Sequence, residues 1–238
     1  MSKTAVIAGV GAGLGASLAK KFAREGCRVA LLARSPGYID TLAAELRESG
    51  TISLALPTDI TDPLQIAGSF SAVRETLGPV DILVNHAGNA AWGNFSELTP
   101  DAFEHSWRVC ALGAFLCAQE AVPDMVERGG GAILFTGATS AIRGRAGAIA
   151  FSSAKFAVRG LAWALAREIG PQGIHVAHII VDGIIDTPDV RTRYQLDDDE
   201  PTLDPDEIAE TYWSLAQQPR SSWTFELDLR PYNEEFFT

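Results

Sequence analysis

The stretch AVIAGVGAGLG at residues 5–15 decides the fold of this 238-residue chain. It begins with a short apolar run, continues through a glycine-rich loop and leads into a segment of helical period. Glycines let the backbone turn tightly and approach a pyrophosphate, and the free N–H groups of the following helix favour that negative charge. The same loop could be a tight structural turn, but its place between a strand and a helix favours a dinucleotide-binding loop. Its candidate cofactor residues are Gly9, Gly13, Leu14 and Gly15.

Short β-branched or aliphatic runs alternate with longer helical segments along the rest of the chain. The strand candidates are 5–8, 28–33, 52–56, 81–85, 132–136, 174–180 and 223–229, and the helix candidates are 13–25, 38–48, 63–77, 100–125, 150–169 and 205–215. This alternation predicts an α/β fold with one Rossmann-like, doubly wound parallel sheet of about seven strands and helices on both faces. We expect a single domain over residues 1–238, with its active crevice at the C-terminal ends of the strands.

Composition and charge narrow the class of partner. Apolar residues make up 47% and charged residues 21% of the chain, which is typical of a globular protein, and the net charge is −11. A negative chain repels phosphate backbones and anionic lipids, so we expect neither a nucleic-acid nor a membrane partner. Three cysteines without CxxC spacing argue against disulfides and thiolate metal sites, and no metal is expected. The apolar run at residues 1–8 is too short for a signal peptide, which predicts a cytoplasmic protein.

Three further motifs follow the glycine loop in order. They are PTDI with Asp59 and Ile60, NHAG with Asn85, Ala87 and Gly88, and DGIIDTP with Gly183, Ile185 and Thr187. Together with the GxxxGxG spacing, these motifs resemble those of the short-chain dehydrogenase/reductase family over nearly the whole chain. The resemblance implies that Asp59 contacts the adenine of a bound cofactor and that DGIIDTP meets its nicotinamide, although Asp182 replaces the family's proline.

The end of the second strand bears on the choice of cofactor. An NAD site usually offers an acidic residue there for the ribose 2′-OH, but this chain has Ala33 followed by Arg34. A guanidinium can hold a 2′-phosphate through charge-assisted hydrogen bonds, although Arg34 could also be an ordinary surface arginine. Ala12 supplies no second basic residue in the loop. We therefore expect NADP(H) to be favoured over NAD(H).

The catalytic motif of the family is incomplete in this chain. The resemblance implies a Ser, a YxxxK motif and an Asn, but the aligned positions hold Ala138, Phe151 and Cys110, and only Lys155 is retained. Phenylalanine has no proton to donate, alanine has no hydroxyl, and cysteine is a poor donor. Lys155 can still bind the nicotinamide ribose. Other candidates for the proton are Ser140, Ser152, Ser153, His86 and Tyr194.

These observations leave two functions open. The first is an NADP(H)-dependent oxidoreductase that acts on a small carbonyl or conjugated enoyl compound with an atypical proton donor, since related enoyl reductases also lack the YxxxK tyrosine. The alternative is a catalytically silent NADP(H)-binding sensor or scaffold. A lid at about 187–206 and the C-terminal segment 221–238 are expected to set the specificity. Apolar residues on several faces of helices 100–125 and 150–169, including Phe115, Leu116, Phe156, Leu161, Trp163 and Leu165, predict a homodimer or homotetramer.

Overall fold

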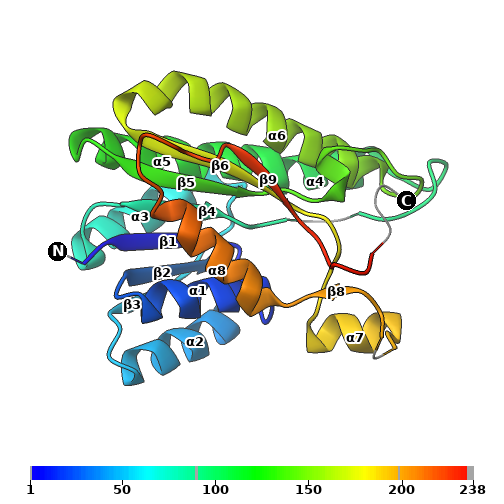
Figure 1. Cartoon of the computed structure of the whole chain (residues 1–238), viewed down its shortest axis with the longest axis horizontal. Helices are drawn as coiled ribbons and strands as arrows, with labels where there is room; N and C mark the ends of the chain where they lie inside the picture. The colour runs from blue at the N-terminus through cyan, green and yellow to red at the C-terminus, as the bar shows by residue number, and fades with distance from the viewer. Residues whose placement is uncertain (1, 89–90, 198, 235–238) are drawn as a thin grey trace.

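A seven-stranded, entirely parallel sheet forms the centre of the computed structural model, which describes residues 2–88, 91–197 and 199–234 (Figure 1). Its strands run in the order β3-β2-β1-β4-β5-β6-β9. They are β1 (Thr4–Ala8), β2 (Arg28–Ala33), β3 (Ser53–Pro57), β4 (Ile82–Asn85), β5 (Gly131–Thr136), β6 (Ile174–Val181) and β9 (Glu226–Leu229). All seven lie at the predicted strands, and the doubly wound α/β fold is confirmed.

Helices cover both faces of the sheet (Figure 1). One face carries α1 (Leu14–Arg24), α2 (Pro36–Glu48) and α8 (Pro205–Ala216), and the other carries α3 (Pro63–Leu77), α4 (Pro100–Trp107), α5 (Gly113–Glu127) and α6 (Ile149–Ile169). Successive strand residues alternate between these layers, so Ile7 packs with α1 while Val6 packs on the opposite side. Burial on both faces explains why the strands are almost continuously apolar.

Local chemistry places the helix starts where the sequence predicted them. Proline occupies the first turn of α3, α4 and α8. No backbone N–H in that turn has a partner within the helix, so the N–H that proline lacks is not missed there. The Asp62 carboxylate accepts a hydrogen bond from Leu64 N at 2.9 Å and caps α3, and Thr99 caps α4 through Ala102 N at 3.2 Å. These contacts lie within three residues of each cap, so local sequence is sufficient to predict them.

Two features differ from the predicted helices and loops. The predicted helix 100–125 is divided by a π-helical turn, Arg108–Leu112, where Gly113 lies so close to Ile60 that a Cβ atom would stand 2.7 Å from its Cδ1 atom. The predicted lid also contains regular structure, namely α7 (Pro188–Tyr194) and the short strand β8 (Thr202–Leu203), which pairs in parallel with β7 (Ile184–Ile185) just before the lid. Position 198 of the lid and positions 235–238 of the C-terminal segment lie outside the described residues.

One helical stretch among the described residues, Pro100–Glu127, is long and apolar enough to cross a membrane by length and composition alone. Within it, Cys117, Ala121 and Met125 are fully buried against the sheet. The apolar character of this stretch therefore serves the protein core.

Candidate active-site cleft

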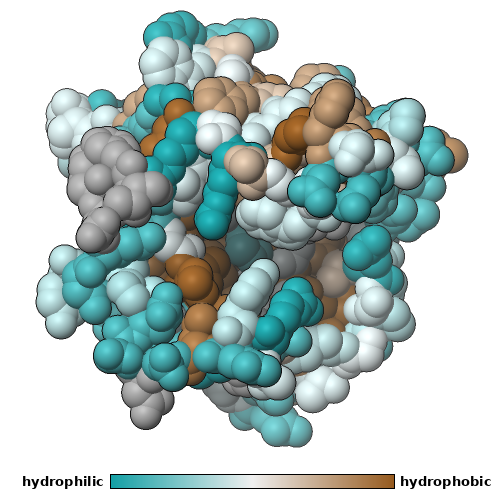
Figure 2. Space-filling model, turned by 90° about the vertical axis from the view of Figure 1, so that its right-hand side faces the viewer, coloured by the Kyte–Doolittle hydropathy of each residue, from teal (hydrophilic) through white to brown (hydrophobic). Residues whose placement is uncertain are grey.

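A large cleft opens at the C-terminal ends of the parallel strands, around the point where β1 and β4 lie side by side. The chain leaves the sheet in opposite directions from these two strands, which makes this the topological switch point where doubly wound folds bind ligands. The cleft has a volume of about 2010 Å³, well above the roughly 300–1,000 Å³ of a single small-molecule pocket. Figure 2 shows the hollow, with hydrophobic residues inside and hydrophilic residues around its rim. The volume is sufficient for a cofactor and a substrate together.

The glycine loop forms one wall of the cleft. Gly9 has a positive φ of 100°, and a Cβ atom there would lie 2.4 Å from Ala87 Cα, so this position requires glycine. Gly15 packs against the backbone of Gly9 and Val10 in the same way. No described side chain caps the N-terminus of α1, and Gly11 and Ala12 line the cleft beside it. Backbone N–H groups at an uncapped helix start fit a pyrophosphate.

The ends of β2 and β3 form a further part of the cleft wall. Arg34 is exposed, lines the cleft and makes no ion pair with any residue that the structure describes. Asp59 also lines the cleft, and its Oδ1 atom accepts hydrogen bonds from Thr61 N at 2.9 Å and from Thr61 Oγ1 at 2.8 Å. The carboxylate is therefore held in place before any ligand binds. Tyr38 lines the same region, although no sequence motif marks it.

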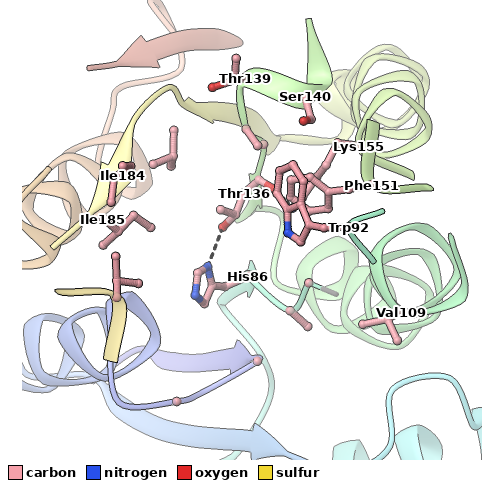
Figure 3. A pocket seen from close by; sticks show the side chains of 18 of the residues that line it. His86, Trp92, Val109, Thr136, Thr139, Ser140, Phe151, Lys155, Ile184 and Ile185 are labelled. Atoms are coloured by element: carbon pink, nitrogen blue, oxygen red, sulfur yellow. Dashed lines mark hydrogen bonds between the residues drawn. The ribbon is translucent and has the colours of Figure 1, made fainter. Parts of the chain in front are cut away.

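Helix α6 supplies the opposite wall through Phe151 and Lys155, one helical turn apart (Figure 3). Lys155 is only 5% exposed, and its Nζ atom donates a hydrogen bond to the Thr136 carbonyl at 2.8 Å. Burial lowers the pKa of this ammonium group from its usual value. The Phe151 ring lies 5.5 Å from Nζ and 5.7 Å from the Trp92 ring, measured to ring centroids. An aromatic surface thus occupies the position where the family resemblance implied a tyrosine hydroxyl.

The loop after β5 contributes Ala138 and Ser140 to the cleft. Ser140 is 5% exposed, and Figure 3 shows it above Lys155 and Phe151. The intervening Thr139 turns its hydroxyl away to donate a hydrogen bond to Asp182, a buried carboxylate that is also paired with Arg230. Of the hydroxyl groups in this loop, that of Ser140 is therefore the one without a hydrogen bond to another described residue.

Three side chains in hydrogen-bond contact connect the cleft with the protein core. His86 Nδ1 lies 3.3 Å from Thr136 Oγ1, which in turn lies 2.8 Å from the hydroxyl of the fully buried Tyr212 (Figure 3 shows the first contact). Burial, with a smaller effect from the Lys155 charge, lowers the pKa of His86 to about 4. His86 is therefore neutral at pH 7 and has no imidazolium proton to donate to a substrate.

Most of the candidate site residues lie on the wall of this one cleft, although they come from all parts of the chain. The lining includes Gly9, Arg34, Asp59, Ile60, Ala87, Gly88, Ala138, Ser140, Phe151, Lys155, Gly183 and Ile185, together with two further proton-donor candidates, His86 and Tyr194. Ser152 and Ser153 do not line it.

Six candidates do not line the cleft. These are Gly13, Leu14, Gly15, Asn85, Cys110 and Thr187. Gly13 packs against Thr187, where a Cβ atom would lie 2.9 Å from its Cγ2 atom, and Asn85 Nδ2 donates to the Ala114 carbonyl at 3.4 Å. Cys110 is buried within the π-helical turn. Trp92, Val109 and Arg143 also line the cleft, although none of them was among the predicted site residues.

The chain is similar in sequence to known oxidoreductases. Residues 3–197 match the sequence model of the short chain dehydrogenase family. The oxidoreductase YxjF of Bacillus subtilis is 33% identical over 191 residues, which cover 80% of this chain and 74% of that protein. Glycine betaine reductase of Emericella nidulans is 36% identical over 132 residues, but these span 56% of this chain and only 10% of that much longer protein.

Solved structures share the fold over almost the full chain. A short-chain dehydrogenase from Rhodopseudomonas palustris superposes with a TM-score of 0.83 at 33% identity, covering 97% of this chain and 99% of the other. A variant of actinorhodin polyketide ketoreductase, solved with NADPH, has a TM-score of 0.87 at 27% identity, covering 96% and 95%.

Proposed function

Because this chain belongs to the short-chain dehydrogenase family, we propose that it is an NADP(H)-dependent oxidoreductase acting on a small carbonyl or conjugated enoyl compound by an atypical proton route. The observation that carries the proposal is one cleft that has the glycine loop on one wall and Lys155 on the other. The bound cofactor supplies a hydride, and the protein supplies binding, orientation and a source of protons.

Arg34 is the residue that selects NADP(H) in this proposal. It follows β2 without an acidic neighbour at the strand end, and its guanidinium makes no ion pair within the described part of the chain. An unpaired arginine at this place favours a 2′-phosphate over a bare ribose hydroxyl. The NADPH bound to the polyketide ketoreductase supports only the coarser point that a protein of this fold can hold this cofactor.

Lys155 binds the nicotinamide ribose hydroxyls. Its Nζ atom is buried, is already oriented by the Thr136 carbonyl, and has two further donor positions. The nicotinamide lies beside Gly183 and Ile185 at the end of β6, and the pyrophosphate lies at the start of α1.

Ser140 is the side chain that supports a proton route best. Phe151 and Ala138 bring no hydroxyl to the cleft, whereas the Ser140 hydroxyl lies in the same loop as Ala138 and above Lys155. A serine has too high a pKa to be the final acid, so its role is to hold the substrate oxygen while a proton arrives from Lys155 or from water.

The second candidate function is a catalytically silent NADP(H)-binding sensor or scaffold. The packing of Phe151 against Trp92 favours it, because two aromatic rings fill the space where a family member would place its acid. The two functions differ in turnover. Purified protein with NADPH is mixed with panels of ketones and conjugated enones, and loss of the nicotinamide absorbance identifies the enzyme. Tight NADPH binding without oxidation by any compound identifies the sensor or scaffold.

We also propose that the protein acts on small-molecule substrates and is a soluble, cytoplasmic homo-oligomer. Exposed aromatic side chains on α5 and α6, namely Phe115, Phe156 and Trp163, provide an apolar surface for a second copy of the chain.

A further inference from the structure

His86 lines the cleft, but the proposed function gives it no role. It lies directly after β4. One edge of its imidazole ring is fixed by a hydrogen bond to Thr136, which is hydrogen-bonded in turn to Tyr212. The direction of those two hydrogen bonds determines which ring nitrogen carries the proton, and therefore what His86 offers to a ligand.

The buried end of this series of contacts sets that direction. Tyr212 is fully buried, and Thr136 Oγ1 is the sole hydrogen-bond partner of its hydroxyl among the described residues. If Tyr212 donates, Thr136 accepts and turns its own proton toward His86 Nδ1, and every hydroxyl proton has an acceptor. The opposite direction leaves the Tyr212 proton buried without one, which is the costly arrangement. A third arrangement, in which Thr136 accepts from both neighbours, leaves the Thr136 proton without an acceptor among the described residues. His86 Nδ1 is therefore an acceptor.

A neutral imidazole that accepts at Nδ1 carries its proton on Nε2. No described residue is hydrogen-bonded to His86 Nε2, and this atom is absent from the buried polar atoms that lack a partner, so it is open to the cleft. Figure 3 shows the ring with this edge turned away from Thr136, on the side of the cavity where Ile185 lies. The protein thus presents a fixed N–H donor at this place.

Thr136 contacts two of the polar side chains that line the cleft, Lys155 and His86. Its carbonyl holds Lys155 Nζ at 2.8 Å, and its hydroxyl holds His86. Since Lys155 is assigned to the nicotinamide ribose in the proposed function, on which this step rests, His86 faces the same half of the cofactor. We propose that His86 Nε2–H donates a hydrogen bond to an oxygen of the nicotinamide riboside half, through a tautomer that Tyr212 and Thr136 hold.

Two ligands separate this role from general loss of structure. NADPH contains the nicotinamide half, whereas adenosine 2′,5′-bisphosphate contains only the adenine half with its 2′-phosphate. We expect His86→Leu to weaken NADPH binding about tenfold in calorimetric titration, the typical effect of one lost hydrogen bond. Binding of the bisphosphate should be unchanged. His86→Gln retains an N–H donor and should bind NADPH within about threefold of the parent.

Nitrogen NMR of the imidazole tests the tautomer without any ligand. The parent should show neutral His86 protonated on Nε2 at pH 7, and Tyr212→Phe should give a mixture of both tautomers. Protonation on Nδ1 in the parent, equal losses for both ligands in His86→Leu, or unchanged NADPH binding in that variant each overturn the inference. Failure of the proposed function is a different result, in which the parent binds neither NADPH nor the bisphosphate.

Discussion

The double variant Phe151→Tyr, Ala138→Ser should acquire ketone reductase activity with NADPH. Phe151 already lies on the cleft wall, 5.5 Å from the Lys155 ammonium and one turn before it on α6. The change adds a phenol hydroxyl beside an existing buried cation, and a neighbouring positive charge favours phenolate and so promotes proton transfer. Ala138→Ser adds a donor for the developing alkoxide.

The size of the gain follows from what each group contributes. A positioned general acid contributes about 10²–10⁴-fold and an oxyanion donor about 10²–10³-fold. The two act on one oxygen, so their effects will not multiply fully. We expect Phe151→Tyr alone to raise kcat/KM for a responsive ketone by at least about 10²-fold, and the double variant to exceed it.

The assay follows NADPH absorbance with a ketone panel for the parent, both single variants and the double variant. Phe156→Tyr is the matched control, because it adds the same hydroxyl to the same helix at a side chain that is 44% exposed. No gain over this control would refute the alignment of Phe151 with the family's tyrosine. A parent that already reduces ketones at about 1–10³ s⁻¹ would refute the claim that the missing hydroxyl limits the reaction.

Three further predictions concern the cofactor, the assembly and pH. Arg34→Ala should weaken NADPH binding about 10- to 100-fold and leave NADH almost unchanged, because only NADPH carries the 2′-phosphate; equal losses in calorimetry would contradict it. Light scattering at micromolar concentration should give a dimer or tetramer, and Phe115→Asp should reduce the mass by placing a charge on the apolar surface of α5; a parent with the mass of one chain would end this prediction. The pKa of His86 is about 4 in the folded chain, below its ordinary value of 6.5. Between these two pH values the unfolded chain binds more protons than the folded chain, so the free energy of unfolding decreases as the pH falls. As the pH falls from 6.5 to 4, the free energy of unfolding should decrease less in His86→Gln than in the parent, by ~1–3 kcal/mol. Parallel pH profiles of the two proteins in chemical denaturation would argue against the lowered pKa of His86.

Much of the site could be predicted because its parts lie in short motifs. The glycine loop, PTDI, NHAG and DGIIDTP each combine a strand end with the residues that follow it, and Phe151 and Lys155 lie one turn apart on α6. In a parallel sheet all strand C-termini meet at one edge, so motifs far apart in the chain must converge. This is why Arg34, Asp59, Ala87 and Lys155 line one cleft.

Side-chain partners across elements could not be predicted in the same way. The approach of Trp92 to Phe151 joins a loop to a helix, and the buried Asp182 is paired with Arg230 from beyond β9. Neither pair has a spacing or period that would indicate contact. Similarly, α7 is too short to give a clear helical pattern inside the lid.

The sequence by itself determined the strands, the helix starts and the glycine loop, because hydrophobic period, proline, caps and glycine act on neighbours within a few residues. It also determined that Phe151 and Ala138 lack the hydroxyls of the family. Only the tertiary structure decided that His86 is a neutral donor, since its Nδ1 atom meets Thr136 from 50 positions away, and Thr136 meets Tyr212 from another 76. Those contacts exist because α8 packs on β5 beneath the cleft, and that packing depends on the summed burial of whole elements rather than on any local pattern.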